Sequence, residues 1–539
     1  MQLYCMMVFL CSVIKGYTQT PTYATTVVSS TNTTTAGNAV DGNVTTRAVL
    51  SASCPSSAGD AEITLEFNTV IAANTTAFIK IETQDALLSS LVQGSLGSLI
   101  GGLLGGQEFT VTAMNGASAV LTGNSNNAST FATEQLRIVR NVGGNYFIRI
   151  TPNAAYNRIK IVNKYIPTLC LGGNRFLYVY DAFTVTGSAT CGEPVYTSTS
   201  ATSILSVAGN NVTNPENVLT PSTTDFSVLN IGLLGVGPII EQTVYYEGPS
   251  NATDVFGVRL SASASLLSLG IASNVSVVAS YQGAAVQTKT LAELITLNAL
   301  SMTGGQITTL YINPGAAVDR ITVRLSSVVG VAQSLNFYGV TKTLSVPGIS
   351  AYGAICSGNA ISLTATVTTG SQIRWYTVAS GGSAIATTNS GVAFTTSVLS
   401  ASTTYYAEQF SGSCIGVRVA VPVIVVAKPV PGVIAGEQTV CNSKQPALLT
   451  SVSNDPGAGI YYRWESSLDG VAWDVIAGAT GLTYQPLVLP KSTFFRRITI
   501  ITASGINCES LPTASVKVTS KNCMVYGNPM VRQRLKTGA

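Results

Sequence analysis

Alternating apolar and polar residues run through most of the chain, which indicates strands rather than helices. Period-two runs occur at 361–367 (ISLTATV), 147–150 (FIRI) and 320–325 (RITVRL). This period directs every second side chain of a strand toward a core. Clusters of glycine, asparagine, serine and proline separate the runs, as at 381–382 (GG) and 454–457 (NDPG). Residues 291–300 fit a short helix, and a strand fits them nearly as well. The pattern predicts an all-β protein.

Two internal duplications divide the predicted strands into four units. At an offset of 179, residues 38–40 (NAV) match 217–219 (NVL) and 79–81 (IKI) match 258–260 (VRL). Further on, 152–159 (PNAAYNRI) match 314–321 (PGAAVDRI) at an offset of 162. Such repeats indicate successive copies of one fold. We expect a jelly-roll-like β-sandwich at 20–191 and a second copy at 192–344.

The second duplication is shorter and covers the C-terminal part of the chain. Cys356, Trp375, Thr404-Tyr405-Tyr406 and Cys414 match Cys441, Trp464, Thr493-Phe494-Phe495 and Cys508. One tryptophan in an early strand and an aromatic pair in a late strand are typical of a sandwich whose tryptophan fills the space between the sheets. We place these units at 345–428 and 429–520, followed by a C-terminal tail at 521–539. The predicted architecture is four tandem β-sandwiches.

The two C-terminal units resemble a known family. Residues 354–358 (AICSG), 373–376 (IRWY), 379–382 (ASGG) and 402–406 (STTYY) look like the Ig-like repeats of Bacteroidota cell-surface proteins, and 464–470 (WESSLDG) with 476–480 (IAGAT) are similar to a sibling repeat. The resemblance covers about 345–520. It implies Ig-like spacer or adhesion modules of secreted proteins, without catalytic residues. Such repeats often accompany gliding-motility-type C-terminal sorting domains, which the sequence after Cys523 does not resemble, so the export route stays open.

The first unit carries a weaker resemblance. Residues 38–46 (NAVDGNVTT) resemble the opening loop of discoidin or galactose-binding-like jelly rolls, and 176–181 (FLYVYD) fit the closing strand. In that family the loop often holds a structural calcium ion, which takes six to eight oxygen ligands. The resemblance implies Asp41, Asn43, Thr45 and Asp181 as oxygen donors. The alternative is an Asp-Gly turn in which the side chains bond the backbone.

The second copy of this unit should lack the ion. Thr220 stands there in place of Asp41. If Tyr338 aligns with Tyr180, Gly339 also replaces Asp181.

The N-terminus predicts export. The apolar run Leu3–Ile14, followed by 16–19 (GYTQ), fits a secretory signal peptide at 1–19, although a basic n-region is missing. A buried N-terminal strand is the alternative. Cleavage would leave eight cysteines, and an even number without a CxxC motif favours disulfides over metal ligands. We therefore expect a secreted protein at the cell surface.

The repeats predict which cysteines pair. Cys356 and Cys414 recur together as Cys441 and Cys508, which favours the disulfides Cys356–Cys414 and Cys441–Cys508. Cys54 and Cys170 are both absent from the second copy, which favours their pairing. Cys191 and Cys523 are left free, paired with each other or bridging two molecules.

Composition argues against several classes of enzyme. The chain contains no histidine, which excludes Ser-His-Asp and Cys-His catalysis and any zinc site with an imidazole ligand. Catalysis would need a carboxylate pair, a lysine-activated serine or a metal, and no motif places one. The net charge of +4 is too balanced to indicate a nucleic-acid partner by charge alone. We expect no enzymatic activity and no cofactor beyond structural calcium.

These observations predict an extracellular, adhesin-like or cell-surface structural protein. The expected partner is a cell-surface or matrix component, either glycan or protein, or a second copy of the chain; no apolar run reaches the roughly 20 residues of a membrane span. The alternatives are a carbohydrate-binding protein that uses Tyr245, Tyr246 or Tyr281 in the N-terminal units, and a fibre or surface-layer subunit. The uncharged stretch 87–106 is either a contact surface or folds its leucines under the sandwich.

Overall fold

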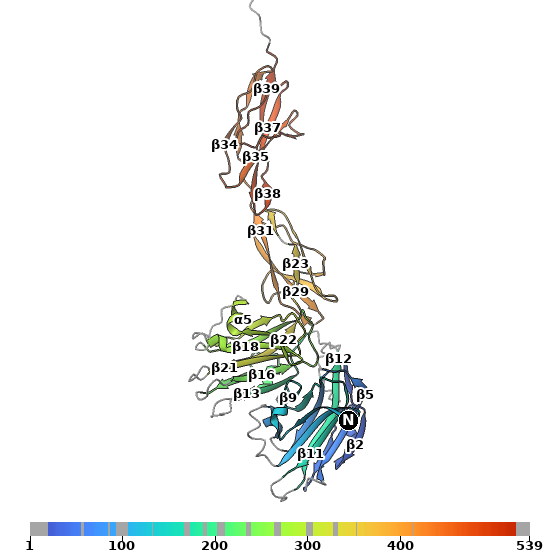
Figure 1. The fold of residues 1–539 in the computed structure, drawn as a ribbon. Coiled ribbons are helices and arrows are strands. Elements are labelled where there is room, and N and C mark those ends of the chain that lie inside the picture. The colour runs from blue at the N-terminus through green and yellow to red at the C-terminus, as the bar shows by residue number, and fades with distance from the viewer. Residues whose placement is uncertain are drawn as a thin grey trace, which may run out of the picture. The chain divides into compact units, whose positions relative to one another are not determined.

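A computed structural model describes residues 20–54, 59–84, 87–92, 106–131, 133–166, 173–186, 191–201, 211–232, 239–263, 271–297, 305–326, 333–351, 353–412 and 414–523. Nearly all regular elements among them are strands, which confirms the predicted all-β class. The chain forms two compact units, residues 1–346 with 409–417 and residues 347–408 with 418–539 (Figure 1). The predicted signal peptide at 1–19 lies outside the described residues.

The first N-terminal sandwich packs a five-stranded sheet against a larger one. In β7 (Gln107–Asn115) the alternating residues Phe109, Val111 and Ala113 are buried, and they join one apolar core with the facing sheet. Burying each such side chain contributes roughly 1.5–3 kcal/mol. The five strands run β2 (Thr26–Thr31), β5 (Ala61–Ile71), β11 (Tyr156–Tyr165), β7 and β8 (Ser118–Asn124). The facing strands are β9 (Leu136–Asn141), β10 (Tyr146–Ile150), β6 (Ala77–Thr83), β12 (Arg175–Thr186), β4 (Ala48–Ala52), β3 (Thr33–Thr34) and β1 (Thr20–Tyr23).

The second N-terminal sandwich repeats this plan around its own apolar core. One sheet runs β14 (Asn211–Thr213), β15 (Ser227–Ile231), β22 (Gln333–Thr343), β17 (Val255–Ala262) and β20 (Thr308–Ile312). The other runs β19 (Ala284–Thr290), β18 (Val275–Tyr281), β21 (Arg320–Ser326), β16 (Ile239–Tyr245) and β13 (Tyr196–Ala201).

Helices in these sandwiches are short. The 3-10 turns are η1 (Ala36–Ala39), η3 (Ala128–Phe131), η4 (Pro215–Leu219) and η5 (Ile271–Asn274), and the α-helices are α2 (Leu87–Val92) and α5 (Leu291–Leu297). Helix α5 confirms the helical alternative for 291–300 over its described part. Helix α2 buries Leu87, Leu88 and Leu91 in the core of the first sandwich, so this part of the 87–106 stretch is not a surface; residues 93–105 lie outside the description.

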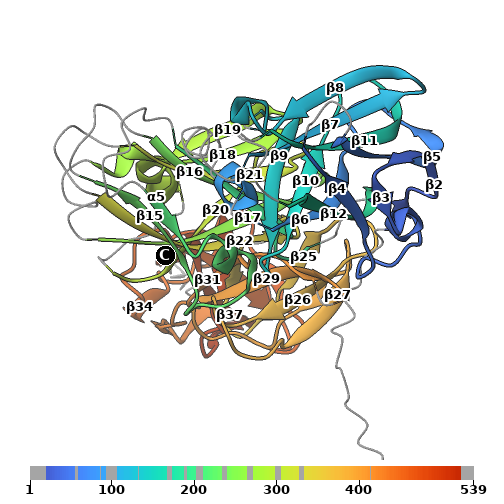
Figure 2. The same ribbon diagram turned by 90° about the horizontal axis from the view of Figure 1, so that it is seen from below.

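One continuous sheet passes through both N-terminal sandwiches. Strand β13 pairs with β16 along one edge and with β9 along the other, where Tyr196 lies opposite Asn141 and Thr197 opposite Arg140. The resulting 12-stranded sheet therefore joins the two copies (Figure 2). At the seam the ring of Tyr196 stacks on Phe78 with centroids 4.7 Å apart. Strand pairing and aromatic packing thus join the two copies, which the sequence predicted as separate sandwiches.

A buried ion-pair cluster lies at the same seam. The Asp319 Oδ2 atom accepts hydrogen bonds from Arg149 of the first copy at 3.2 Å and from Arg320 of the second at 3.0 Å. Both guanidinium groups are 2% exposed and contact the ring of Tyr245. Burial, together with the nearby Arg320 charge, lowers the pKa of Arg149 to about 10. Burial alone would raise the pKa of Asp319, but the hydrogen bond and charge of Arg320 lower it. All three groups are therefore ionised at neutral pH.

The second compact unit contains the two predicted Ig-like sandwiches. Trp375 and Trp464 are 0% exposed and occupy the centres of their cores, as the repeat predicted. The strands of the first are β23 (Gly348–Ala351), β25 (Ser362–Thr366) and β28 (Phe394–Thr395), facing β24 (Ala354–Cys356), β31 (Val419–Val426), β29 (Thr403–Ser411), β26 (Gln372–Tyr376), β27 (Ala386–Asn389) and β30 (Cys414–Ile415). Those of the second are β32 (Val433–Ala435) and β34 (Thr450–Ser453), facing β33 (Gln438–Cys441), β39 (Val516–Lys521), β37 (Thr493–Ala503), β35 (Ile460–Ser467), β36 (Asp474–Val475) and β38 (Ile506–Glu509).

The disulfides differ from the predicted pairs. Described cysteines form Cys191–Cys414, Cys356–Cys508 and Cys441–Cys523. The predicted Cys356–Cys414 and Cys441–Cys508 are therefore wrong, and so are a free Cys191 or Cys523 and a Cys191–Cys523 bond. Cys54 is disulfide-bonded, but Cys170 lies outside the described residues, so their pairing stays a prediction.

Strand geometry explains why the predicted bonds cannot form. Cys356 lies opposite Val426 at one end of β31, whereas Cys414 pairs with Ser411 beyond the other end. The 8 residues of β31 span roughly 26 Å, and a disulfide needs Cα atoms within about 7 Å. Cys441 and Cys508 are separated in the same way, since Cys441 lies opposite Lys521 and Cys508 opposite Ile501. Each cysteine can reach only a partner from outside its own sandwich.

We predict that Asp319→Asn destabilises the N-terminal unit by about 3–5 kcal/mol, because two buried guanidinium groups lose their shared counter-ion. Urea unfolding followed by near-ultraviolet circular dichroism measures the loss. The matched control is Asp60→Asn, which removes a half-exposed ion pair with Lys164 and should cost less than about 1 kcal/mol. Equal effects of the two substitutions would show that the seam cluster does not join the copies.

Candidate functional site

The loop after η1 of the first sandwich brings the two predicted carboxylates together. The Asp181 Oδ1 atom, at the β-bulge of β12, accepts the amide of Gly42 at 3.2 Å. Asp41 accepts the amide of Asn43 at 2.9 Å and the hydroxyl of Thr46 at 2.8 Å. Hydrogen bonds from Asn43 and Thr46 lower the pKa of Asp41.

Asp181 is an unusual carboxylate. Its residue is 1% exposed, and its buried Oδ2 atom has no hydrogen-bond partner. Burial raises its pKa to about 6, and the negative charge of the neighbouring Asp41 adds to the rise. Two facing carboxylates, one of them desolvated and only partly hydrogen-bonded, favour the binding of a cation.

The other predicted calcium ligands point elsewhere. The Asn43 Oδ1 atom accepts both the amide and the hydroxyl of Thr45, at 3.1 and 2.7 Å, so these two side chains form the turn that the sequence offered as the alternative. The hydroxyl next to the carboxylates is that of Thr46, which the sequence did not single out. Among the described residues, no three or more acidic or cysteine side chains converge on one point. A cation in this loop would therefore also need backbone oxygens.

The second copy fills the equivalent place with an arginine. Arg259, which aligns with Lys80, donates to the carbonyl oxygens of Thr220 and Pro221 at 3.0 and 2.8 Å. Gly339 at the bulge has φ +107°, and a Cβ atom there would lie 2.3 Å from the Val218 carbonyl oxygen. No aspartate can therefore stand at this position.

In the first copy the aligned cation turns away from the loop. The Lys80 Nζ atom lies over the ring of Tyr180 at 4.1 Å instead of contacting the loop carbonyls. The comparison of the two copies indicates that a positive charge belongs at this loop, and that only the second copy supplies it from its own chain.

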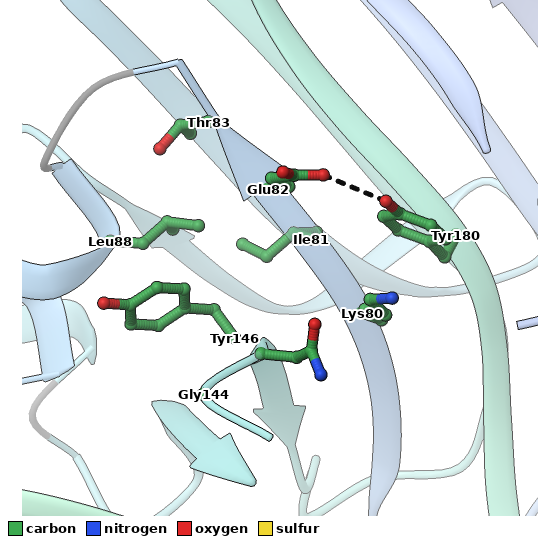
Figure 3. A pocket seen from close by; sticks show the side chains of 9 residues that line it. Lys80, Ile81, Glu82, Thr83, Leu88, Gly144, Tyr146 and Tyr180 are labelled. Carbon is green, nitrogen blue, oxygen red and sulfur yellow. Dashed lines mark hydrogen bonds between the residues drawn. The ribbon is translucent and has the colours of Figure 1, made fainter. Parts of the chain in front are cut away.

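A pocket of about 400 Å³ adjoins this loop on the first sandwich. Figure 3 shows the Glu82–Tyr180 hydrogen bond, 2.9 Å long, between β6 and β12, and Tyr146 beside Leu88. Arg47 donates to Glu82 and lies over the ring of Tyr178 at 3.8 Å. Cations thus already contact the rings of Tyr178 and Tyr180, which leaves Tyr146 as the tyrosine most open to a ligand. The pocket is lined by Lys80, Ile81, Glu82, Thr83, Leu88, Gly144, Asn145, Tyr146 and Tyr180.

A second pocket, of about 320 Å³, lies at the seam between the two copies. Of the three tyrosines proposed as a sugar platform, Tyr245 is 0% exposed and donates to or accepts from Ser198 at 2.9 Å, and Tyr246 is 6% exposed. Both are packing residues, so their proposed platform role is wrong. Tyr281 is partly exposed and lines the seam pocket with Arg149, Gln282 and Asp319.

Family comparisons identify the C-terminal half. A family described as "Ig-like domain CHU_C associated" matches residues 345–426, and one described as "Domain of unknown function (DUF8696)" matches 430–522. No curated protein matches the chain.

Several solved structures are distantly similar. A β-1,2-glucanase from Parabacteroides distasonis is 11% identical over 62% of this chain and 38% of its own length, with a TM-score of 0.22. The fibronectin(III)-like modules of Clostridium thermocellum CbhA are 18% identical over 33% of this chain and 94% of theirs, with a TM-score of 0.21. Chicken CNTN1 FN1–FN3 domains are 9% identical over 55% and 97%, with a TM-score of 0.22. At these TM-scores the likenesses carry no argument about function.

The family match agrees with the buried tryptophan of each C-terminal sandwich and with the repeated order of their strands. The C-terminal half of this chain is therefore built of Ig-like repeats, the first of them of the CHU_C-associated kind.

Proposed function

We propose that the protein is an extracellular, adhesin-like or structural protein of the cell surface. The observation that carries the proposal is the bonding of the cysteines: all seven described cysteines are in disulfides. Such bonds form and persist in oxidising compartments and are rare in the cytosol. Tandem Ig-like modules, which often mediate binding, fit the same role. Within the described residues no helix has the length and apolar character needed to cross a membrane.

The proposal includes the absence of catalysis. The chain has no histidine, and the buried charged residues at the seam hydrogen-bond one another. The carboxylate with the largest rise in pKa, Asp181, lies beside another carboxylate in a loop better suited to a cation than to a substrate. These features favour a binding or structural role.

Carbohydrate binding by the N-terminal unit is the second candidate. The observation that favours it is the pair of polar pockets, each with one partly exposed tyrosine, Tyr146 or Tyr281. Sugar ligands combine hydrogen bonds to hydroxyl groups with stacking on an aromatic ring. Against it stands the modest size of both pockets, near the lower end of the range for small-molecule sites.

We also propose a structural calcium ion in the loop of the first sandwich. Asp41 and Asp181 would hold it, together with loop carbonyl oxygens, and it would neutralise the two facing carboxylates. The arginine in the second copy supports this proposal, because Arg259 places a positive charge against the carbonyls of the aligned loop.

Surface exposure is the direct test of the main proposal. Protease treatment of intact cells of the native host should cleave the protein, and labelling with a thiol reagent before reduction should modify none of Cys191, Cys356, Cys414, Cys441, Cys508 and Cys523. A cytoplasmic control protein must stay intact in the same cells. Protection of the protein in intact cells, together with reactive thiols, would contradict the proposal.

A glycan array separates the two candidates. The main proposal predicts no saturable signal that depends on Tyr146 or Tyr281. Saturable binding to one sugar, lost in Tyr146→Ala or Tyr281→Ala and kept in the control Tyr461→Ala from the second Ig-like sandwich, would instead establish carbohydrate binding. Electron microscopy of the same sample tests the fibre or surface-layer alternative, which a monodisperse monomer contradicts.

Calcium should stabilise the first sandwich. At about 100 times its dissociation constant, a single ion adds about 2.7 kcal/mol to the free energy of unfolding. We predict a higher melting temperature in calcium than in chelator for the wild type and for the control Asp60→Asn. Asp181→Asn should abolish this difference, and should raise the melting temperature in chelator because the amide needs no buried charge. A calcium response that survives both Asp41→Asn and Asp181→Asn would place the ion elsewhere.

A further inference from the structure

The three disulfides interleave along the sequence. Their partners are separated by 223, 152 and 82 residues, and each bond begins inside the loop closed by the one before it. Cys356 lies between Cys191 and Cys414, and Cys441 lies between Cys356 and Cys508. Because consecutive loops overlap, opening one loop never releases the whole segment from 191 to 523.

The bonds follow the internal repeat. Cys356 and Cys441 hold equivalent places, on strands that run parallel to β31 and β39. Cys414 and Cys508 are also equivalent, in the hairpins that follow β29 and β37. The hairpin cysteine of the second Ig-like sandwich bonds back to the early-strand cysteine of the first. The hairpin cysteine of the first bonds back to Cys191 in the same way, and Cys523 closes the last position, Cys441.

This connectivity creates a short covalent route through the chain. From Cys191 the route crosses to Cys414, follows the backbone to Cys441 and crosses to Cys523. It contains only 27 backbone steps (441 − 414), whereas the backbone alone takes 332 (523 − 191). At about 3.5 Å per extended residue, the bonded segment can lengthen to roughly 95 Å and the unbonded one to roughly 1,150 Å.

The backbone on this route is itself well held. It contains β31, which pairs with β24 on one side and β29 on the other. It also contains the 429–432 linker, where the Pro431 carbonyl accepts the hydroxyl of Thr499 at 3.2 Å. Arg497, 0% exposed, donates to the carbonyls of Leu482 and Ser453 beside it. A pull along the route must therefore break strand pairing and side-chain contacts before it gains even the short length.

We propose that residues 191–523 form a load-bearing tether, a segment that stays short under tension because its disulfides carry the pull past most of its strands. The function is mechanical resistance between whatever holds the two ends of the chain. It goes beyond the proposed surface role and does not depend on it, because the limit on extension is a property of the purified chain.

The bonds contribute unequally to this limit, which makes the proposal testable. Without Cys441–Cys523, the route runs from Cys414 back to Cys356 over 58 residues, and from Cys508 to Cys523 over 15. Without Cys191–Cys414, it takes 165 residues from Cys191 to Cys356 and the same 15 at the end. Without Cys356–Cys508, the route of 27 residues is unchanged.

Single-molecule stretching of the oxidised full chain, with handles at its two ends, measures these differences. Relative to the wild type, Cys441→Ser/Cys523→Ser should add 46 residues, roughly 160 Å, and Cys191→Ser/Cys414→Ser should add 153, roughly 540 Å. Cys356→Ser/Cys508→Ser is the matched control and should add nothing. Residues before 191 and after 523 contribute the same length in every variant.

Misfolding of a variant does not blur the outcome. Repeating the stretch in denaturant leaves the final length set by covalent bonds alone, and peptide mapping verifies which bonds remain. The three predicted increments in their stated order support the tether. A wild type that extends by the full 332 residues, or a control pair that lengthens the chain, would overturn it.

Discussion

The architecture depends on one constraint, namely that the cysteines of each Ig-like sandwich lie at opposite ends of its strands. Cys356 and Cys414 are held apart by β31, so neither can close its own sandwich. Each must bond outward, and the result is a chain of units joined through sulfur as well as through peptide bonds. Sandwiches of this size would fold around their buried tryptophans without such bonds. The disulfides therefore fix how the units are connected, and the cores fix what each unit is.

The two N-terminal copies show how a duplicated fold can diverge. Their sheets merge across β9 and β13, and Asp319 balances an arginine from each copy. The loops that align at 41 and 220 both accommodate positive charge. In one copy a guanidinium group supplies it, and in the other two facing carboxylates leave room for an ion. A substitution in one copy thus changes which partner completes the loop while the strands around it are retained.

Sequence periodicity predicted the strands, the four units and the buried tryptophans, because burial of alternate side chains is written directly into the pattern. It also identified Asp41 and Asp181, which lie 140 residues apart (181 − 41) and meet in space. It failed for the cysteines, since recurrence in two copies shows that positions are equivalent but not which end of a strand they occupy. It failed for Tyr245 as well, because alternation cannot reveal that a second copy covers the outer face of a sheet. The merged sheet gave no sequence signal at all.

Peptide mapping of native material under non-reducing conditions tests the central claim most directly. The account predicts peptides that link Cys191 to Cys414, Cys356 to Cys508 and Cys441 to Cys523. Peptides that link Cys356 to Cys414 and Cys441 to Cys508, with each Ig-like sandwich closed on itself, would contradict it.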